Sequence, residues 1–199
     1  MTLIHLVRHG EHNMAGRALP GRTPGVGLSQ RGQAEIAIIA ERLAGEGVTA
    51  LYSSPLQRTR ESAEIIAARL DLPINIHDEL IELDFGDWTG ATYESIRADP
   101  RWQRWSTQRC IATIPGGESM RAVQRRAVDA LLDIAERHPD DTIAAISHGD
   151  VIRSALLYVL GMPLDLYNRI EIALASVTTL RLDNTGIRFL AMSQRPLVD

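Results

Sequence analysis

Short apolar stretches rich in β-branched residues recur along the chain, separated by longer amphipathic stretches. The first runs from Leu3 to Val7 and is followed by Gly10, a pattern that predicts a buried strand and then a turn. The other predicted strands cover residues 48–53, 74–78, 140–147, 176–182 and 187–193. The last two flank the sequence DNTG, which predicts a tight turn between a strand and its returning partner.

Helices are expected between these strands. Ser29 can cap a helix that ends near Gly45 and Gly47. Its inner face is expected to carry Ala34, Ala37, Ile38 and Ala44. In the stretch "SSPLQRTR", Ser54 can cap a second helix with Pro55 at the first helical position, so that this helix reaches about Leu70. Arg58 then falls in its first turn.

Two more helices are predicted in the second half of the chain. After "PGGES", apolar residues at helical spacing predict a long amphipathic helix: Met120, Val123, Ala127, Leu131 and Ile134. Asp150 can cap the next helix, which is expected to end at Gly161. The Gly/Pro-rich stretch 16–27 is too punctuated for a helix or strand, and so long a loop in a compact domain is usually functional.

The alternation of strands and helices predicts the α/β class, as a three-layer αβα sandwich. Its central sheet should be mostly parallel, with one antiparallel C-terminal strand. Residues 1–199 are expected to form a single domain. The irregular segment 92–117, which contains two tryptophans and three arginines, is expected to be a small cap or lid insertion.

Composition adds little to this picture but narrows the class of protein. The 199 residues carry a formal net charge of −4, which gives no indication of a nucleic acid or membrane partner. A single cysteine, Cys110, cannot form an internal disulfide, and the N-terminus lacks the features of a signal peptide, so a cytoplasmic location is expected. Any anion-binding site must therefore be local.

Two predicted strands end in the same way. "HLVRHGE" at 5–11 and "AAISHGD" at 144–150 each place His, Gly and an acid after an apolar strand. In open α/β sheets, ligands bind at the carboxyl ends of strands, so His9 and His148 are expected to converge there. Each following glycine, Gly10 and Gly149, lets the backbone turn sharply and brings main-chain N–H groups close to a ligand.

An anion suits this cluster better than a metal ion. A metal held by His5, His9 and His12 would lie beside the guanidinium of Arg8, which repels a dication, and strand alternation does not direct all three rings to one point. Arg8, Arg58 and the two histidines would instead supply charge-assisted donors to a phosphate. A neutral histidine is also a competent nucleophile toward phosphorus. Neither a metal nor a cofactor is expected.

Phosphoryl transfer from an ester oxygen also requires a proton for the leaving oxygen. Within "IELDFGD", either Glu82 or Asp84 could supply it. Taken alone, each of these acids is more simply interpreted as a solvated surface group.

These residues and their order resemble the histidine phosphatase superfamily, which includes cofactor-dependent phosphoglycerate mutases and many small phosphatases. The matching stretches are "LVRHGE" at 6–11, "LSQRGQAE" at 28–35, "YSSPLQRTRESAE" at 52–64, "ELDFGDWTG" at 82–90, "PGGES" at 115–119 and "ISHGD" at 146–150. The resemblance implies that His9 becomes the phosphohistidine and that Arg8, Arg58 and His148 bind the phosphoryl group. It also implies that Glu82, rather than Asp84, is the proton donor.

The chain departs from this family pattern after the nucleophile. Many members have Ser or Thr three residues after it and Asn six residues after it, where this chain has His12 and Ala15. His12 or Asn13 could take over the missing contact, although an exposed loop position is the simpler interpretation of both. The loop at 16–27 is expected to place Arg22 and Thr23 beside the phosphate, with Gly149 as a further substrate-binding residue.

The resemblance favours a metal-independent phosphatase of small phosphomonoesters. It implies that the true mutases of this family are longer chains with extra segments in the insertion region, whereas this chain is short. A phosphoglycerate mutase is the alternative, and a non-catalytic phospho-ligand binding module is less favoured because His9, Arg8 and Glu82 are all present. The expected partner is a small phosphorylated metabolite, and a homodimer is possible. The insertion offers a candidate lid for an anionic or ring-bearing substrate, formed by Trp102, Trp105, Arg101, Arg104 and Arg109.

Overall fold

The central element is a six-stranded sheet whose strands follow the order β3-β2-β4-β1-β5-β6. The computed structural model describes residues 1–195. The strands are β1 (Thr2–Arg8), β2 (Ala50–Ser53), β3 (Ile74–Ile76), β4 (Thr142–Ser147), β5 (Val177–Asp183) and β6 (Gly186–Gln194). Strands β1 to β4 pair in parallel, whereas β5 pairs antiparallel with both β1 and β6. The prediction of one antiparallel C-terminal strand is confirmed.

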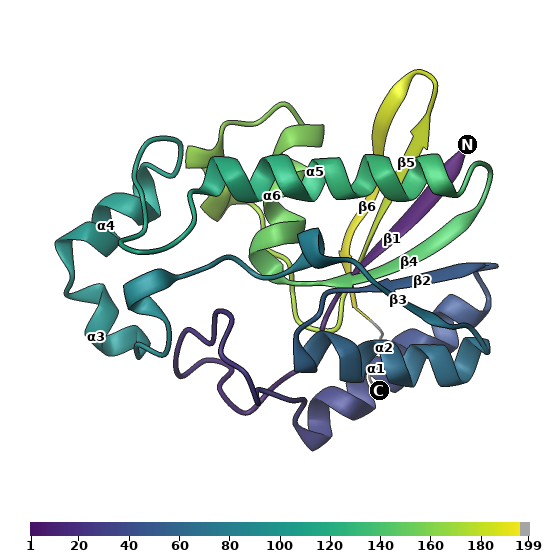
Figure 1. Ribbon diagram of the computed structural model, residues 1–199, viewed down its shortest axis with the longest axis horizontal. Helices are drawn as coiled ribbons and strands as arrows, with labels where there is room; N and C mark the ends of the chain where they lie inside the picture. The colour runs from purple at the N-terminus through teal and green to yellow at the C-terminus, as the bar shows by residue number, and fades with distance from the viewer. Residues whose placement is uncertain (196–199) are drawn as a thin grey trace.

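Helices cover both faces of the sheet, as the three-layer prediction requires (Figure 1). One face packs against α1 (Gln30–Ala44) and α2 (Gln57–Leu70), through apolar residues that include Val7, Leu51 and Ile146. The other face packs against α5 (Met120–Arg137) and α6 (Gly149–Val159), through residues that include Ile4, Leu6 and Ala145. Side chains alternate across each strand, so neighbouring residues of β1 enter different cores.

The segment 92–117 contributes no strand to the sheet. It contains α3 (Tyr93–Arg97) and α4 (Pro100–Thr107), which lie beyond the end of the sheet in Figure 1. Three short 3-10 helices complete the elements: Asp78–Leu80, Gly86–Trp88 and Leu164–Arg169. The loop 16–27 is joined to this region by a single β-bridge between Ala18 and Thr92.

The buried face of α1 differs from the prediction. The structure buries Ile36, Ile39, Ala40 and Leu43, whereas Ala34 and Ala37 are exposed and Ile38 is 38% exposed. Apolar residues surround most of this helix, so spacing alone allows more than one inner face. The face that packs is the one carrying branched chains large enough to fill the space against α2. In α5 only one face is apolar, and all five predicted core residues are buried.

Two predicted helix caps are wrong. Helix α2 begins at Gln57, with Leu56 at the N-cap position, and Ser54 bonds a histidine ring instead of capping. Helix α6 has His148 at its N-cap position, and Asp150 lies inside the first turn. Both polar side chains lie among the groups at the carboxyl ends of the strands instead of capping a helix. By contrast, Ser29 caps α1 as predicted, since its side chain accepts a hydrogen bond from the Gly32 N–H.

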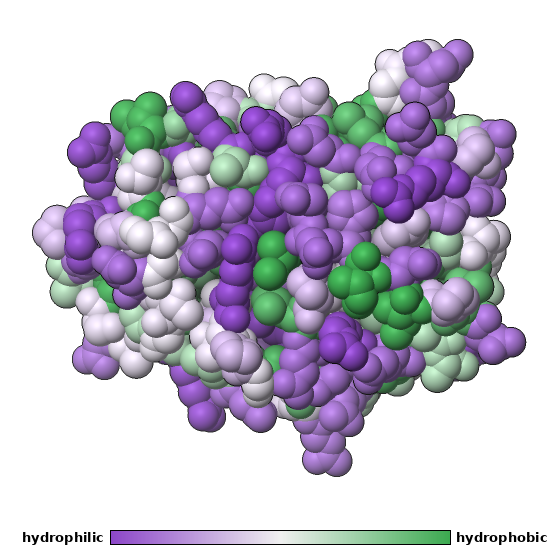
Figure 2. Space-filling view, viewed as in Figure 1, coloured by the Kyte–Doolittle hydropathy of each residue, from purple (hydrophilic) through white to green (hydrophobic). Residues whose placement is uncertain are grey.

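The surface seen in Figure 2 is mostly polar, with apolar residues in small, separate groups. Among residues 1–195, no helix is both long enough and apolar enough to cross a membrane.

Candidate active site

The carboxyl ends of β1 and β4 bring the two His-Gly sequences together. These strands are parallel neighbours, with Arg8 opposite Ser147 in the register. The next residue on each strand is a histidine, and the ring centroids of His9 and His148 lie 5.2 Å apart. The two rings are 139 positions apart in the sequence, and they meet where the sequence predicts.

Each glycine after these histidines allows a close approach that a side chain would block. A Cβ on Gly10 would lie 2.5 Å from the Gly32 carbonyl oxygen, so the turn after β1 packs directly on the start of α1. A Cβ on Gly149 would lie 3.0 Å from Cζ of Arg8. The second glycine therefore makes room for the Arg8 guanidinium beside the first turn of α6.

His9 is buried and held in a defined orientation. Its Nδ1 lies 2.8 Å from the Gly10 carbonyl oxygen, and its Nε2 lies 3.3 Å from Nε of Arg58, which donates to it. A carbonyl can only accept, so Nδ1 carries the proton and Nε2 carries the lone pair. Burial, followed by the cations of Arg58 and Arg8, holds the pKa of His9 well below its ordinary value. The ring is therefore a neutral base.

Three groups around His9 have a nitrogen atom without a hydrogen-bond partner among residues 1–195: Nε of Arg8, Nη1 of Arg58 and Nδ1 of His148, the last of which lies 3.7 Å from Oε2 of Glu82. Arg58 is fully buried, and its Nη2 donates to the Gly21 carbonyl oxygen at 2.9 Å. Arg8 donates through Nη1 to the Ile172 carbonyl oxygen. These bonds fix the two guanidinium groups while leaving other donors available to an anion.

His148 is anchored by the serine that sequence reasoning assigned to a helix cap. The Ser54 hydroxyl lies 2.8 Å from Nε2 of His148, and both side chains are fully buried. Burial lowers the pKa of His148 well below its ordinary value, and Arg58 adds to the effect. The ring is therefore neutral until an anion arrives to favour its charged form.

Glu82 lies close to both Arg58 and His148. Its Oε2 lies 4.0 Å from Nη2 of Arg58 and 3.7 Å from Nδ1 of His148, and its Oε1 accepts the Leu83 N–H at 2.9 Å. Burial, with a contribution from the Asp150 carboxylate, raises the pKa of Glu82 to about 7. Near neutral pH this carboxyl group can both give and take a proton.

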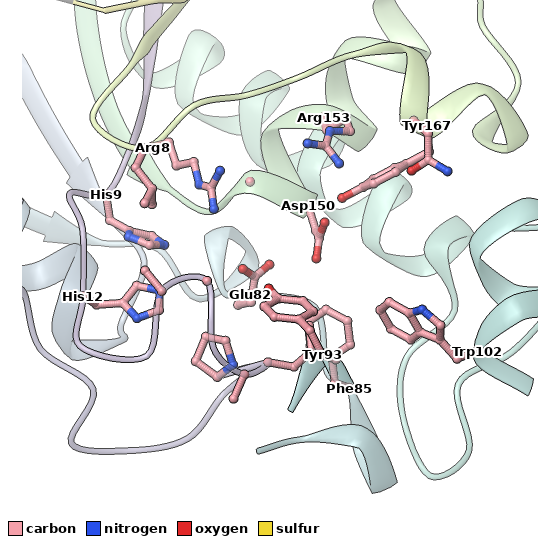
Figure 3. A pocket seen from close by; sticks show the side chains of 18 of the residues that line it. Arg8, His9, His12, Glu82, Phe85, Tyr93, Trp102, Asp150, Arg153 and Tyr167 are labelled. Carbon is pink, nitrogen blue, oxygen red and sulfur yellow. The ribbon is translucent and has the colours of Figure 1, made fainter. Parts of the chain in front are cut away.

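A cavity of about 300 Å³ is lined by Arg8, His9 and Glu82, whereas Arg58 and His148 are fully buried behind its lining. In Figure 3, Arg8 and His9 lie on one side, Arg153 and Tyr167 lie on the other, and Glu82 and Asp150 lie between them. The segment 92–117, which we call the cap, contributes side chains from α3, α4 and the loop after α4: Tyr93, Trp102, Trp105 and Arg109. The candidate site thus joins the sheet to the segment 92–117.

Several predicted site residues do not line the cavity, among them Arg58 and His148, which adjoin His9 behind it. Arg22 donates to the Glu82 carbonyl oxygen and to Glu118, at 2.8 and 3.1 Å, and neither Arg22 nor Thr23 lines the cavity. The Arg22 guanidinium forms ion pairs with the carboxylates of Glu118 and Asp84, at 3.1 and 3.8 Å. Asp84 also stays outside the cavity lining. Gly149 does line the cavity.

The interpretation of His12 as an exposed loop residue is wrong. Its side chain lines the cavity and is 6% exposed, and its ring centroid lies 5.3 Å from that of His9. Burial, with help from Arg58 and Arg8, lowers the pKa of His12 to about 4. Asn13 is exposed, as expected. His5 lies in β1, where its Nδ1 bonds the Thr179 hydroxyl at 3.0 Å.

The cap arginines differ from one another in a way that the sequence does not reveal. Arg101 and Arg104 are exposed, whereas Arg109 is buried between aromatic rings. Sequence reasoning also missed Arg153 and Tyr167. Arg153 could have been found, because it lies four residues after Gly149 and so on the same face of α6. No sequence signal connects Tyr167 to the cap.

Within the described residues, no three His, Cys, Asp or Glu side chains are arranged to hold a metal ion. The charge of the cavity points to an anion instead. Its lining carries three guanidinium groups against two carboxyl groups: Arg8, Arg109 and Arg153, with Glu82 and Asp150.

Comparisons with known proteins agree with this chemistry. A family model described as the histidine phosphatase superfamily (branch 1) matches residues 4–195. Phosphoserine phosphatase 1 of Hydrogenobacter thermophilus is 32% identical over 168 residues, which cover 82% of this chain and 79% of that protein.

Solved structures extend the agreement to the fold. A Bacillus stearothermophilus protein, YhfR, superposes with a TM-score of 0.92 at 27% identity, over 98% of both chains. A mutant phosphoserine phosphatase from Entamoeba histolytica, in complex with phosphoserine, superposes with a TM-score of 0.87 at 25% identity, over 97% of both chains.

Proposed function

Because this chain belongs to the histidine phosphatase superfamily, we propose that it is a metal-independent phosphatase that hydrolyses small phosphomonoesters through a phosphohistidine on His9. The observation that carries the proposal is the state of His9. In the buried, neutral imidazole the lone pair of Nε2 accepts only a long hydrogen bond, from Nε of Arg58 at 3.3 Å, and the guanidinium groups of Arg8 and Arg58 keep further donors without a partner among residues 1–195. A nucleophile with nearby anion-stabilising donors is the arrangement that phosphoryl transfer to nitrogen requires.

In the first step, Nε2 of His9 gives up its hydrogen bond from Nε of Arg58 and attacks phosphorus, and the bond from phosphorus to the ester oxygen breaks. Arg8, Arg58 and His148 stabilise the charge spread over the phosphoryl oxygens, because their unengaged donors lie around His9. These groups are held by hydrogen bonds to the protein before substrate binds, so little reorganisation is needed during the reaction.

Glu82 supplies the proton that the leaving oxygen takes up. Its pKa of about 7 leaves a large protonated fraction at neutral pH. In the second step, the Glu82 carboxylate accepts a proton from water as that water attacks phosphorus. The bond from phosphorus to Nε2 then breaks, inorganic phosphate leaves, and both His9 and Glu82 return to their starting states.

The size of the cavity and the names of similar proteins support a small substrate. A cavity of about 300 Å³ is at the lower end of the range for ligand sites, which suits a metabolite better than a protein segment. Two similar proteins are named phosphoserine phosphatases. The positive charge around His9 supports a reaction without a metal ion, since guanidinium groups already supply the charge that a dication would bring.

Rapid-quench experiments test this proposal. With p-nitrophenyl phosphate labelled at phosphorus, we expect an acid-labile, base-stable phosphoenzyme in the natural chain and none in His9→Ala. The same variant should lose nearly all turnover, by roughly 10⁴-fold or more. Unchanged turnover in His9→Ala, or activity abolished by a chelator and restored by added metal, would overturn the proposal.

A mutase begins with the same phosphohistidine and is distinguished by its products. With 3-phosphoglycerate, in the presence and absence of 2,3-bisphosphoglycerate, we expect release of phosphate to exceed isomerisation. Isomerisation that outruns phosphate release would identify the chain as a mutase instead.

A further inference from the structure

The end of the cavity away from His9 is also lined by cations. We call Arg109, Arg153 and Tyr167 the distal wall. Arg109 comes from the loop after α4, Arg153 from α6 and Tyr167 from the 3-10 helix Leu164–Arg169, and all three line the cavity. Figure 3 shows Arg153 and Tyr167 on the opposite side of Asp150 from Arg8 and His9.

The distal wall is built by stacking. Cζ of Arg109 lies 3.8 Å from the ring centroid of Trp105 and 3.7 Å from that of Tyr167, and Cζ of Arg153 lies 4.2 Å from the Tyr167 ring. Aromatic faces hold a guanidinium group without occupying its N–H donors, which point outward in its plane. Stacking therefore fixes these cations and leaves their hydrogen-bonding capacity unused.

The donor atoms that stacking leaves free are buried. Nε and Nη1 of Arg109, Nε of Arg153 and the Tyr167 hydroxyl have no hydrogen-bond partner among residues 1–195. Arg109 as a whole is only 6% exposed. A buried charged donor without a partner is destabilising, so such donors are expected where a ligand completes them.

No carboxylate neutralises these arginines by direct contact. Within the described residues, neither Arg109 nor Arg153 forms an ion pair within 4 Å. Asp150 is the acid that acts on both from a greater distance. Burial lowers the pKa of Arg109 to about 10, which leaves it charged at neutral pH.

We infer that the distal wall is a subsite for a carboxylate on the substrate, so that the preferred phosphomonoesters are short molecules with an anionic group at each end. The inference rests on the proposed function, since it assumes that the phosphoryl group lies at His9. Charge alternates along the cavity to match such a molecule, with cations at both ends and the carboxyl groups of Glu82 and Asp150 between them. The planar fork of arginine suits the two oxygens of a carboxylate.

Matched substrates test this inference. O-phosphoserine and phosphoethanolamine differ only by a carboxylate, while 3-phosphoglycerate and glycerol 3-phosphate differ by a carboxylate in place of a hydroxymethyl group. We expect the natural chain to favour the carboxylated member of each pair by about 10- to 100-fold in kcat/KM, which is the range for hydrogen bonds to charged groups. In Arg109→Met and Arg153→Gln, both ratios should fall toward one.

Arg104→Met is the control, because Arg104 is an exposed arginine of helix α4, which precedes the loop that carries Arg109, and it lies outside the cavity lining. It should keep the natural ratios. Melting temperatures show whether each variant folds, and Arg153→Gln provides a second test if Arg109→Met does not. Equal kcat/KM values within both pairs in the natural chain, or undiminished ratios in a folded arginine variant, would overturn the inference.

Hydrolysis of p-nitrophenyl phosphate separates this result from failure of the proposed function. A chain that hydrolyses this ester through phospho-His9 but ignores carboxylates is a phosphatase without the subsite. A chain that hydrolyses none of the esters fails the proposed function itself.

Discussion

The two ends of the cavity hold cations by different means. His9, Arg8, Arg58 and His148 form the phosphate end, where hydrogen bonds to backbone carbonyls fix the two guanidinium groups and a hydrogen bond to Ser54 fixes the neutral His148 ring. At the distal wall, Arg109 and Arg153 are fixed by stacking on aromatic rings. The phosphate end lies at the strand ends of the sheet, whereas the distal wall joins the cap to α6 and the 3-10 helix that follows it.

This difference in how the cations are held suggests a division of roles, with catalysis at the phosphate end and substrate selection at the distal wall. Hydrogen bonds to backbone fix a donor to within a few tenths of an ångström, which transition-state stabilisation requires. A stacked guanidinium is held by the face of a ring and not by hydrogen bonds of fixed direction, which suffices for binding an anion in the ground state. Changes at the phosphate end should therefore reduce turnover of every substrate alike, whereas changes at the distal wall should alter the preference among substrates.

The largest effect expected short of removing His9 comes from Glu82→Gln. This variant keeps the shape of the side chain but cannot donate a proton to the leaving oxygen, so kcat should fall by about 10²- to 10⁴-fold. The loss should be similar for O-phosphoserine and phosphoethanolamine. A loss confined to one of them, in steady-state assays of both, would contradict the separation of the two ends.

The pH dependence provides an internal check on Glu82. Proton donation requires its protonated form, and its pKa is about 7, so kcat/KM should fall about tenfold per pH unit above that value. The pKa of His9 lies well below its ordinary value, so His9 should stay neutral throughout this range. In Glu82→Gln the fall above pH 7 should disappear, and its persistence would assign the proton to another group.

The next effect in size concerns the contact between α6 and Arg8. Gly149→Ala would place a Cβ 3.0 Å from Cζ of Arg8, so the guanidinium must shift by a few tenths of an ångström. Because small misplacements of catalytic groups reduce rates steeply, kcat/KM should fall roughly 10- to 100-fold. Gly45→Ala is the control, since its nearest atom is at 3.5 Å and it lies at the end of α1. Equal activity of both variants would show that Arg8 needs no such space.

The phosphate end was largely predictable from the sequence because its parts are local patterns. A strand followed by His-Gly predicts where His9 and His148 lie, and the parallel order of β1 and β4 then brings them together. Arg58 is buried in the first turn of α2, the turn in which the sequence places it. The two wrong N-cap predictions also arise from local patterns. Ser54 and Asp150 follow strands, and at such positions a polar side chain can contact the site instead of capping the helix.

The distal wall was not predictable because no local pattern connects its parts. Arg101, Arg104 and Arg109 look alike in sequence, and only Arg109 meets the rings of Trp105 and Tyr167. That meeting depends on how the cap packs against the segment after α6, which is a long-range contact. The burial of His12 was missed for the same reason, because it depends on the bridge between His12 and Leu28 and on the packing of its ring beside His9.

A smaller effect is expected from the residue that positions His148. Ser54→Ala removes the hydroxyl 2.8 Å from Nε2 of His148, and a hydrogen bond of this kind contributes about 1 kcal/mol, so kcat/KM should fall about fivefold. Ser54→Thr retains the hydroxyl and should restore most of the activity, which a purely structural role for the small side chain would not allow. The inhibition constant of inorganic phosphate should rise in Ser54→Ala by a similar factor.

The smallest effect is expected from His12→Ala, which tests whether His12 belongs to the phosphate end or to the distal wall of the cavity. Its ring lies beside His9, and its Nδ1 has no hydrogen-bond partner in residues 1–195, so it can donate to the phosphoryl group but carries no positive charge at neutral pH. A neutral donor contributes less than a guanidinium, so His12→Ala should lower kcat/KM about three- to fivefold. Because its pKa is about 4, this factor should stay constant from pH 5.5 to 8. Asn13→Ala, at the exposed neighbouring position, should have no effect.

The same loss of kcat/KM in His12→Ala for O-phosphoserine and for phosphoethanolamine would place His12 at the phosphate end. A loss confined to O-phosphoserine would instead show that selection for the carboxylate extends across the whole cavity, and the division between the two ends would fail.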